Sequence, residues 1–196
     1  MNSAAISVLF DYEIAEAASV LQRGGLILFP TDTIWGIGCD ACNEAAVEKV
    51  YALKQRDRSK PFVLLVDGLE MLRAYVEHVH PRIETLLIHH TRPLTVVYDK
   101  GVNLAPNAIG KDGSAAIRIP VDEYCLSLIR KFGKPIVASS ANISNEPFPS
   151  SFQEVSQKVK QGVDFISKHR QKEISDNEPS VIVKLSDREE LIFLRD

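Results

Sequence analysis

The stretch GGLILFPTDTIWGIG, residues 24–38, joins the end of a helix to a buried strand and a polar loop. Apolar residues at helical spacing predict a helix over 13–23, which the two glycines end. The four apolar residues 26–29 predict a buried strand that closes at Pro30. The loop that follows carries hydroxyls, a carboxylate and an indole, so it can wrap around a small polar ligand. It can equally be a structural turn, with Asp32 capping the backbone and Trp35 filling the core.

Strands and helices alternate along the rest of the chain. Further helices are predicted over 43–54, 69–76, 83–88, 124–131 and 152–160. Further strands are predicted over 62–66, 94–98, 115–119, 135–138, 180–185 and 191–194. No Pro/Ser-rich linker or internal repeat interrupts them, so we predict one α/β domain over residues 1–196, with a mixed β-sheet and flanking helices. Glycine, proline and polar residues gather in the loops 30–41, 55–61, 108–114 and 139–151, where we expect the functional groups.

The composition is that of an ordinary globular protein without a strong electrostatic preference. Its 196 residues carry 23 Lys+Arg and 26 Asp+Glu, a net charge of −3, so any contact with a nucleic acid must be local. Three cysteines in a chain without a basic, apolar leader favour a reducing cytosol. No apolar run approaches the roughly 20 residues that cross a bilayer, and we expect a cytoplasmic protein.

A basic cluster follows the helix predicted for 43–54. Lys54, Arg56, Arg58 and Lys60 lie within seven positions of one another. Cations at the C-terminal end of a helix are favoured by its dipole, which is sufficient reason for such a cluster. However, Pro61 and the next buried strand hold this one close to the core. Lysine point charges and the paired donors of arginine also suit a polyphosphate.

Two further features lie in or directly after predicted strands. Arg118 interrupts an apolar strand, where it is either an edge-strand residue, a member of a structural ion pair, or a ligand for a carboxylate. The segment SSANIS, residues 139–144, begins where a strand ends, which is where open α/β sheets commonly bind ligands. Serine and asparagine are also ordinary turn and capping residues, so this signal is weak alone.

Other familiar site signatures are incomplete or missing. Cys39 and Cys42 have the spacing of a redox pair or half a zinc site, but no second CxxC or spaced histidine pair completes it. We therefore expect two packed free thiols and no metal site. Neither GxxxxGK[ST] nor GxGxxG is present, so any ATP site must belong to a fold other than the P-loop or dinucleotide-binding folds.

Several segments occur in a specific order along nearly the whole chain. They are PTDTIWGIGCDA (30–41), Lys54-x-Arg56 with Lys60-Pro61, PLTVV (93–97), SxxxRxP (114–120), SSANIS (139–144), PSVIV (179–183) and the closing Leu194-Arg195. Each is unspecific alone, but as an ordered set they resemble the YrdC/TsaC/Sua5 family. The resemblance implies a twisted α/β sheet with a concave, positively lined cavity.

The resemblance also implies an activity. The expected enzyme is the short, single-domain threonylcarbamoyl-AMP synthase, a nucleotidyltransferase that condenses L-threonine, bicarbonate and ATP into threonylcarbamoyl-adenylate and releases pyrophosphate. Mg²⁺ is expected to accompany the ATP, bound mainly through phosphates and water. The adenylate would pass to a separate tRNA threonylcarbamoyltransferase complex that modifies tRNAs reading ANN codons. A weak tRNA contact is left open.

Site residues are carried over at the positions that match the motifs. Those expected to bind threonine are Thr31, Thr33, Arg118 and Ser180. Those expected to bind ATP are Lys54, Arg56, Lys60, Ser114, Ser140, Asn142 and Arg195. Lys54 and Arg56 are also expected to act in catalysis, because they would stabilise charge that gathers on the phosphate oxygens.

Several departures from the family pattern and two rival functions remain. Trp35 stands where the family more often has Tyr, Phe148 where a Ser is common, and Arg92-Pro93 replaces the usual Gly-Pro. Leu65 stands where the family commonly has a histidine, and the segment 168–178 is charged and free of glycine where the family loop is usually glycine-rich. One rival function is a YrdC-like module that holds RNA or a nucleotide without turnover. The other is a carbamoyl-adenylate-forming enzyme, although such domains are embedded in a much longer chain.

Overall fold

The computed structural model describes residues 3–174, 179–186 and 188–195. The helices are α1 (Ser3–Gln22), α2 (Glu44–Lys54), α3 (Leu69–Tyr75), α4 (Pro81–His89), the short 3₁₀ helix η1 (Pro106–Ala108), α5 (Glu123–Phe132) and α6 (Gln157–Gln161). The strands are β1 (Ile27–Phe29), β2 (Gly36–Gly38), β3 (Val63–Leu65), β4 (Leu94–Tyr98), β5 (Ala115–Arg118), β6 (Ile136–Ser140), β7 (Phe165–Ile166), β8 (Val181–Leu185) and β9 (Leu191–Arg195).

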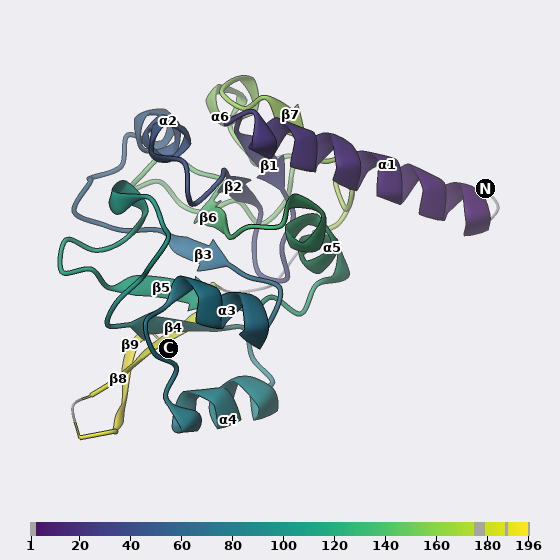
Figure 1. Ribbon diagram of the computed structural model, residues 1–196. Coiled ribbons are helices and arrows are strands. Elements are labelled where there is room, and N and C mark those ends of the chain that lie inside the picture. The colour runs from purple at the N-terminus through teal and green to yellow at the C-terminus, as the bar shows by residue number, and fades with distance from the viewer. Residues whose placement is uncertain (1–2, 175–178, 187, 196) are drawn as a thin grey trace.

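The described strands form one mixed, nine-stranded sheet in the order β7-β1-β2-β6-β3-β5-β4-β8-β9 (Figure 1). β3 pairs in parallel with β5, whereas β6 lies antiparallel to both β2 and β3. This arrangement makes β6 and β5 inner strands, and it brings the loops that follow β1 and β6 to neighbouring positions. The prediction of a mixed α/β sheet with flanking helices is confirmed.

The two faces of the sheet are covered by different helices. One apolar cluster joins α2, α3 and α4 to alternate strand residues such as Leu64, Ile117 and Val137. The other joins α1 and α5 to the intervening residues, among them Leu65 and Ile136. This alternation is the two-residue period of a pleated strand. The N-terminal part of α1 extends beyond the sheet (Figure 1).

Local signals explain where the central helices begin and end. The side chain of Asn43 accepts a hydrogen bond from the N–H of Ala46 and so caps α2, as the sequence predicts. Asp122 caps α5 in the same way through the N–H of Cys125. α5 then ends at Gly133, which takes the left-handed conformation with φ 80°.

Several predictions about elements are wrong in part. The helix predicted over 13–23 begins earlier, at Ser3, as α1. The helix predicted over 152–160 is confined to α6, because residues 152–154 form a turn and Ser156 caps a new start. β2 lies inside the segment predicted as a loop, and β7 was not predicted at all. Both are short strands whose pairing partners, β6 and β1, are far away in sequence. In the part of the chain that the structure describes, no helix combines the length and apolarity that a membrane crossing requires.

Candidate functional site

A cavity of about 560 Å³ lies on the sheet face that α1 and α5 cover only in part. Its floor consists of side chains from β3, β5, β4 and β8, namely Val63, Ala116, Val97 and Ile182. Along each strand these residues alternate with residues that pack under α2 and α3. Because successive side chains of a strand point to opposite faces of the sheet, these four point toward the cavity. Its rim comes from the loop after β1, the end of β6, and β9.

Arg118 and the loop after β1 form one wall of this cavity. The guanidinium of Arg118 lies 2.6 Å from the carboxylate of Asp32, and both side chains are buried. The hydroxyls of Thr31 and Thr33 lie 2.8 Å apart, and Thr31 also donates to the carbonyl of Ile34. The loop is therefore held by its own polar groups. Of the interpretations of Arg118, the ion pair is confirmed and the edge strand is wrong, because β5 lies between β3 and β4.

A second arginine, Arg195, lines the same cavity as Arg118. Arg195 of β9 donates through Nε and Nη2 to the carbonyl of Ser180, at 3.0 and 2.7 Å. The Ser180 hydroxyl lies 2.7 Å from that of Thr95, so this corner is polar and fixed. Burial, and then the nearby charge of Arg118, lowers the pKa of Arg195. Two guanidinium groups that repel each other within one cavity lining favour the binding of an anionic ligand there.

A smaller cavity of about 270 Å³ shares Arg56 and Ser140 with the larger one. Lys54, the last residue of α2, is 1% exposed there. Its ammonium group donates to the carbonyls of Ser140 and Asn142 and, at 3.3 Å, to the side-chain oxygen of Asn142. Burial, followed by the charge of Arg56, lowers the pKa of Lys54 to about 7. Lys54 therefore clamps the loop after β6 and brings a cation to the wall of the cavity.

Arg56 connects the two cavities. Its guanidinium donates to the carbonyls of Lys60 and Pro61, each at 3.0 Å, and lies 5.1 Å from the centre of the Phe62 ring. These contacts fix the side chain before any ligand arrives, and burial lowers its pKa. Arg58 differs, because it is exposed and pairs with Glu48 on the outside of α2. The basic cluster therefore contains both a cavity-lining arginine and a surface arginine.

The structure brings most of the predicted site residues together. Thr31, Thr33, Arg56, Arg118, Ser140, Ser180 and Arg195 line the larger cavity, and Lys54, Arg56, Lys60, Ser140 and Asn142 line the smaller one. Ser114 lines neither, and its hydroxyl donates to Asp112 at 2.6 Å. Leu65 pairs with Arg118 in the sheet register but packs into the cluster under α1 and α5.

Sequence reasoning missed several contributors. Asp32 was considered as a backbone cap or as part of a ligand-binding loop, but not as the partner of Arg118. Phe148, from the loop after β6, adds aromatic surface to the larger cavity beside Trp35, which was considered as part of that ligand-binding loop. Arg170 donates to the carbonyl of Thr31 at 3.2 Å and pairs with Asp122 at 2.9 Å, so it ties a distant segment to the loop after β1. A charged residue within the atypical 168–178 segment was the one available signal.

The cysteines lie outside both cavities. Cys39 and Cys125 are buried and Cys42 is partly buried, and all three are free thiols. Burial, with the charge of Asp40, raises the pKa of Cys39 and of Cys42, so both remain protonated at neutral pH. Among residues 3–174, 179–186 and 188–195, no group of three or more His, Cys, Asp or Glu side chains is placed to hold a metal ion.

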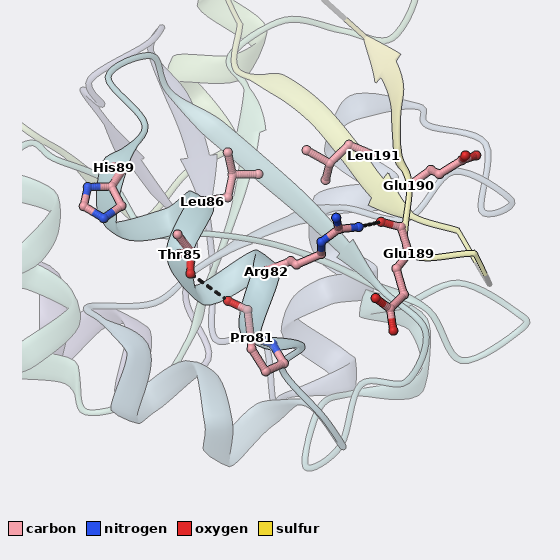
Figure 2. Close-up of a pocket in the computed structure, with 8 residues that line it drawn as sticks. All are labelled: Pro81, Arg82, Thr85, Leu86, His89, Glu189, Glu190 and Leu191. Atoms are coloured by element: carbon pink, nitrogen blue, oxygen red, sulfur yellow. Dashed lines mark hydrogen bonds between the residues drawn. The ribbon is translucent and has the colours of Figure 1, made fainter.

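Another cavity, of about 800 Å³, lies between α4 and the β8–β9 hairpin (Figure 2). Figure 2 shows Leu86 and Leu191 facing each other, while Arg82 reaches the backbone of Glu189. Thr85 donates back to its own helix, to the carbonyl of Pro81. Arg82 and Thr85 are thus engaged locally, and the predicted site residues lie elsewhere. Most of the predicted site residues are concentrated in the two cavities that share Arg56.

Comparison with known proteins identifies related chains and structures. The family model Sua5_yciO_yrdC, described as "Telomere recombination", matches residues 19–196. A threonylcarbamoyl-AMP synthase of Hahella chejuensis is 35% identical over 154 residues, which cover 77% of this chain and 83% of that protein. One of Pyrococcus abyssi is 33% identical over 149 residues, 75% of this chain, and the match spans only 44% of the relative. The structure of P. abyssi Sua5 complexed with L-threonine matches 94% of this chain and 54% of that one, at 27% identity and a TM-score of 0.84.

Proposed function

Because the chain belongs to the Sua5, YciO and YrdC family, we propose that it is a threonylcarbamoyl-AMP synthase. It would condense L-threonine, bicarbonate and ATP into threonylcarbamoyl-adenylate and release pyrophosphate. The observation that carries the proposal is the junction of two cavities at Arg56 and Ser140, one lined by Arg118 and Arg195 and the other by a basic cluster. The proposal assigns the reaction to residues 1–196 as one catalytic domain.

Threonine fits the larger cavity. Its carboxylate would lie between Arg118 and Arg195, where a negative charge relieves the repulsion between the two guanidiniums. The hydroxyls of Thr31, Thr33 and Ser180 lie in the same lining and would contact the amino acid. The bound L-threonine named for the P. abyssi Sua5 structure supports this assignment.

ATP fits the smaller cavity and the junction. Lys54, Arg56 and Lys60 bring three cations to a space that also contains the amide of Asn142. Arginine forks and lysine ammonium groups are the usual partners of phosphate oxygens. Ser140 would contact the nucleotide at the junction, Arg195 from the larger cavity, and Ser114 from outside both linings.

The reaction would take place at the junction of the two cavities, where threonine and ATP meet. The threonine amine and bicarbonate combine to an N-carboxylate with loss of water. A carboxylate oxygen then attacks the α-phosphorus of ATP, the bond to the bridging oxygen breaks, and pyrophosphate leaves. Arg56 and Lys54 would stabilise the charge that builds up on the phosphate oxygens. Mg²⁺ would accompany ATP through phosphates and water, which suits a lining rich in cations and amides.

The product would serve tRNA modification. Threonylcarbamoyl-adenylate is a mixed anhydride that water destroys, so a cytoplasmic tRNA threonylcarbamoyltransferase complex would have to take it up quickly. With a net charge of −3, a direct tRNA contact would be weak and confined to the basic cluster.

Pyrophosphate release from Mg-ATP tests the proposal. We expect release only when L-threonine and bicarbonate are both present. Arg56→Gln should abolish it, whereas the matched control Arg58→Gln, outside both cavities, should leave it unchanged. Release without threonine would contradict the proposal. Folded protein that binds ATP without releasing pyrophosphate would favour the binding module.

A further inference from the structure

Ser144 is the last residue of the SSANIS segment, and the proposed reaction assigns it no role. It lies in the loop after β6 and lines the smaller cavity together with Lys54, Arg56 and Asn142. Sequence reasoning assigned Ser140 and Asn142 of this segment to the nucleotide but not Ser144. Its position raises the question of what its hydroxyl binds.

The backbone of Ser144 is fixed beside Lys54. Its N–H donates to the carbonyl of Lys54 at 2.8 Å, which is the carbonyl at the end of α2. The ammonium group of the same lysine holds the carbonyl of Asn142 at 2.6 Å. Lys54 is therefore hydrogen-bonded to the loop after β6 through both its main chain and its side chain. Ser144 thus lines the cavity from a backbone that hydrogen bonds hold in place, and its own Oγ is buried.

The hydroxyl of Ser144 has no partner of its own in this position. Its Oγ is one of three buried side-chain polar atoms that lack a hydrogen bond among the described residues. The other two belong to Asn107 and Tyr124, which line neither of the two site cavities. Buried polar groups are normally paired, so an unpaired one calls for a specific explanation.

The surrounding groups indicate the kind of partner. Lys54, Arg56 and Lys60 offer only donors, and together they favour an anion rich in acceptors. A serine hydroxyl can donate one more hydrogen bond to such an anion. A phosphate oxygen satisfies the hydroxyl and the cations at once.

We propose that Ser144 is a further nucleotide-binding residue, whose hydroxyl donates a hydrogen bond to a phosphate oxygen of ATP. The identity of the ligand rests on the proposed function. The hydroxyl remains unpaired in the free protein and gains its partner when ATP binds. Ser144 therefore contributes to affinity for ATP but not to stability of the unliganded fold.

Calorimetric titration of Ser144→Ala with Mg-ATP tests this inference. We expect the Kd for ATP to rise about tenfold, the typical effect of losing a hydrogen bond to a charged group. The Kd for L-threonine should stay unchanged, and the melting temperature should stay equal or rise, because no contact of the free protein is lost. Ser127→Ala removes an exposed hydroxyl of α5 that bonds to Glu123, and it serves as the control.

Two results would overturn the inference. One is an unchanged Kd for ATP in Ser144→Ala. The other is a lower melting temperature with equal losses of ATP and threonine affinity, which would assign a structural role. Binding needs no turnover, so wild-type protein that binds ATP without making product would overturn the proposed function alone. Failure of wild-type protein to bind ATP would overturn both.

Discussion

Arg118 and Asp32, 86 residues apart in sequence, form an ion pair of 2.6 Å whose side chains are only 4% and 7% exposed. Asp32 also accepts the N–H of Val121 at 3.2 Å, which fixes its carboxylate. Arg118 is thus held in place by a protein carboxylate in the absence of any ligand. A buried pair of this kind orients a group more reliably than it stabilises a fold.

Breaking this pair should affect stability and binding separately. Arg118→Met leaves the buried carboxylate of Asp32 without its cation, so we expect about 3–5 kcal/mol less stability in urea unfolding. The double variant Asp32→Asn/Arg118→Met removes both charges and should regain most of that loss. Threonine affinity, measured by calorimetry, should be lost in both. Recovery of threonine binding in the double variant would show that Arg118 does not bind threonine.

The lowered pKa of Lys54 predicts that the free energy of unfolding rises with pH. Its pKa is lowered from 10.5 to about 7 by burial and by Arg56, whereas in the unfolded chain it keeps its ordinary value. Above about pH 7 the unfolded state therefore binds more protons than the folded state, and the free energy of unfolding rises with pH. Below pH 7 both states are protonated and this contribution to the slope vanishes.

The measurement is urea unfolding of wild type and Lys54→Met at several pH values between about 7 and 8. We expect the variant to be less stable throughout, because the clamp on the loop after β6 is gone. Its free energy of unfolding should also rise less steeply with pH. Equal slopes in the two proteins would show that Lys54 keeps its proton in the folded state.

Arg170 combines a left-handed backbone, φ 58°, with side-chain contacts to Thr31 and Asp122. Arg170→Ala and Arg170→Gly lose the same contacts, but only alanine keeps a Cβ in the left-handed conformation. The glycine variant should therefore be more stable by about 1 kcal/mol in thermal or urea unfolding. Both should bind threonine more weakly, because the loop after β1 loses an anchor. Equal stability of the two variants would exclude backbone strain at this residue.

Gly38 permits the close approach of β2 to its neighbours. A Cβ there would lie 2.7 Å from the ring of Phe29 and 3.0 Å from the carbonyl of Val137, so Gly38→Ala should cost about 1–3 kcal/mol. Gly36 lies in the same strand, and its Cβ would meet nothing closer than 3.5 Å. Gly36→Ala is the matched control and should cost less than about 1 kcal/mol. Similar losses in both would contradict the packing argument.

The sequence predicted the elements whose signals are local. The helix from 44 to 54 has its cap at Asn43, and the apolar runs of the sheet core are unambiguous. The partner of Arg118 could not be predicted, because it depends on where β1 and β5 meet in the folded sheet. The start of α6 was misplaced because residues 152–154 carry a helix-like pattern but form a turn, and Phe152 packs on Trp35 at 5.0 Å.

The candidate site was predictable as a set of residues but not as a geometry. Motif order selected Lys54, yet only the fold reveals that its ammonium group is occupied by backbone carbonyls. Ser144 belongs to the SSANIS motif and Arg170 to the atypical charged segment, but neither signal identifies the single residue, since their importance comes from contacts across the chain. In the atypical segment 168–178, residues 175–178 lie outside the described residues, so the effect of its missing glycines stays a prediction there.

The most direct test of the central claim follows the carbon of bicarbonate. Purified protein is incubated with Mg-ATP, L-threonine and either ordinary or ¹³C-labelled bicarbonate, quenched quickly in the cold, and examined by mass spectrometry. The account predicts an adenylate that contains threonine and gains the mass of one labelled carbon, and its absence from Arg56→Gln. An adenylate without the label, or none from folded wild-type protein, would contradict the claim that these two cavities join threonine, bicarbonate and ATP.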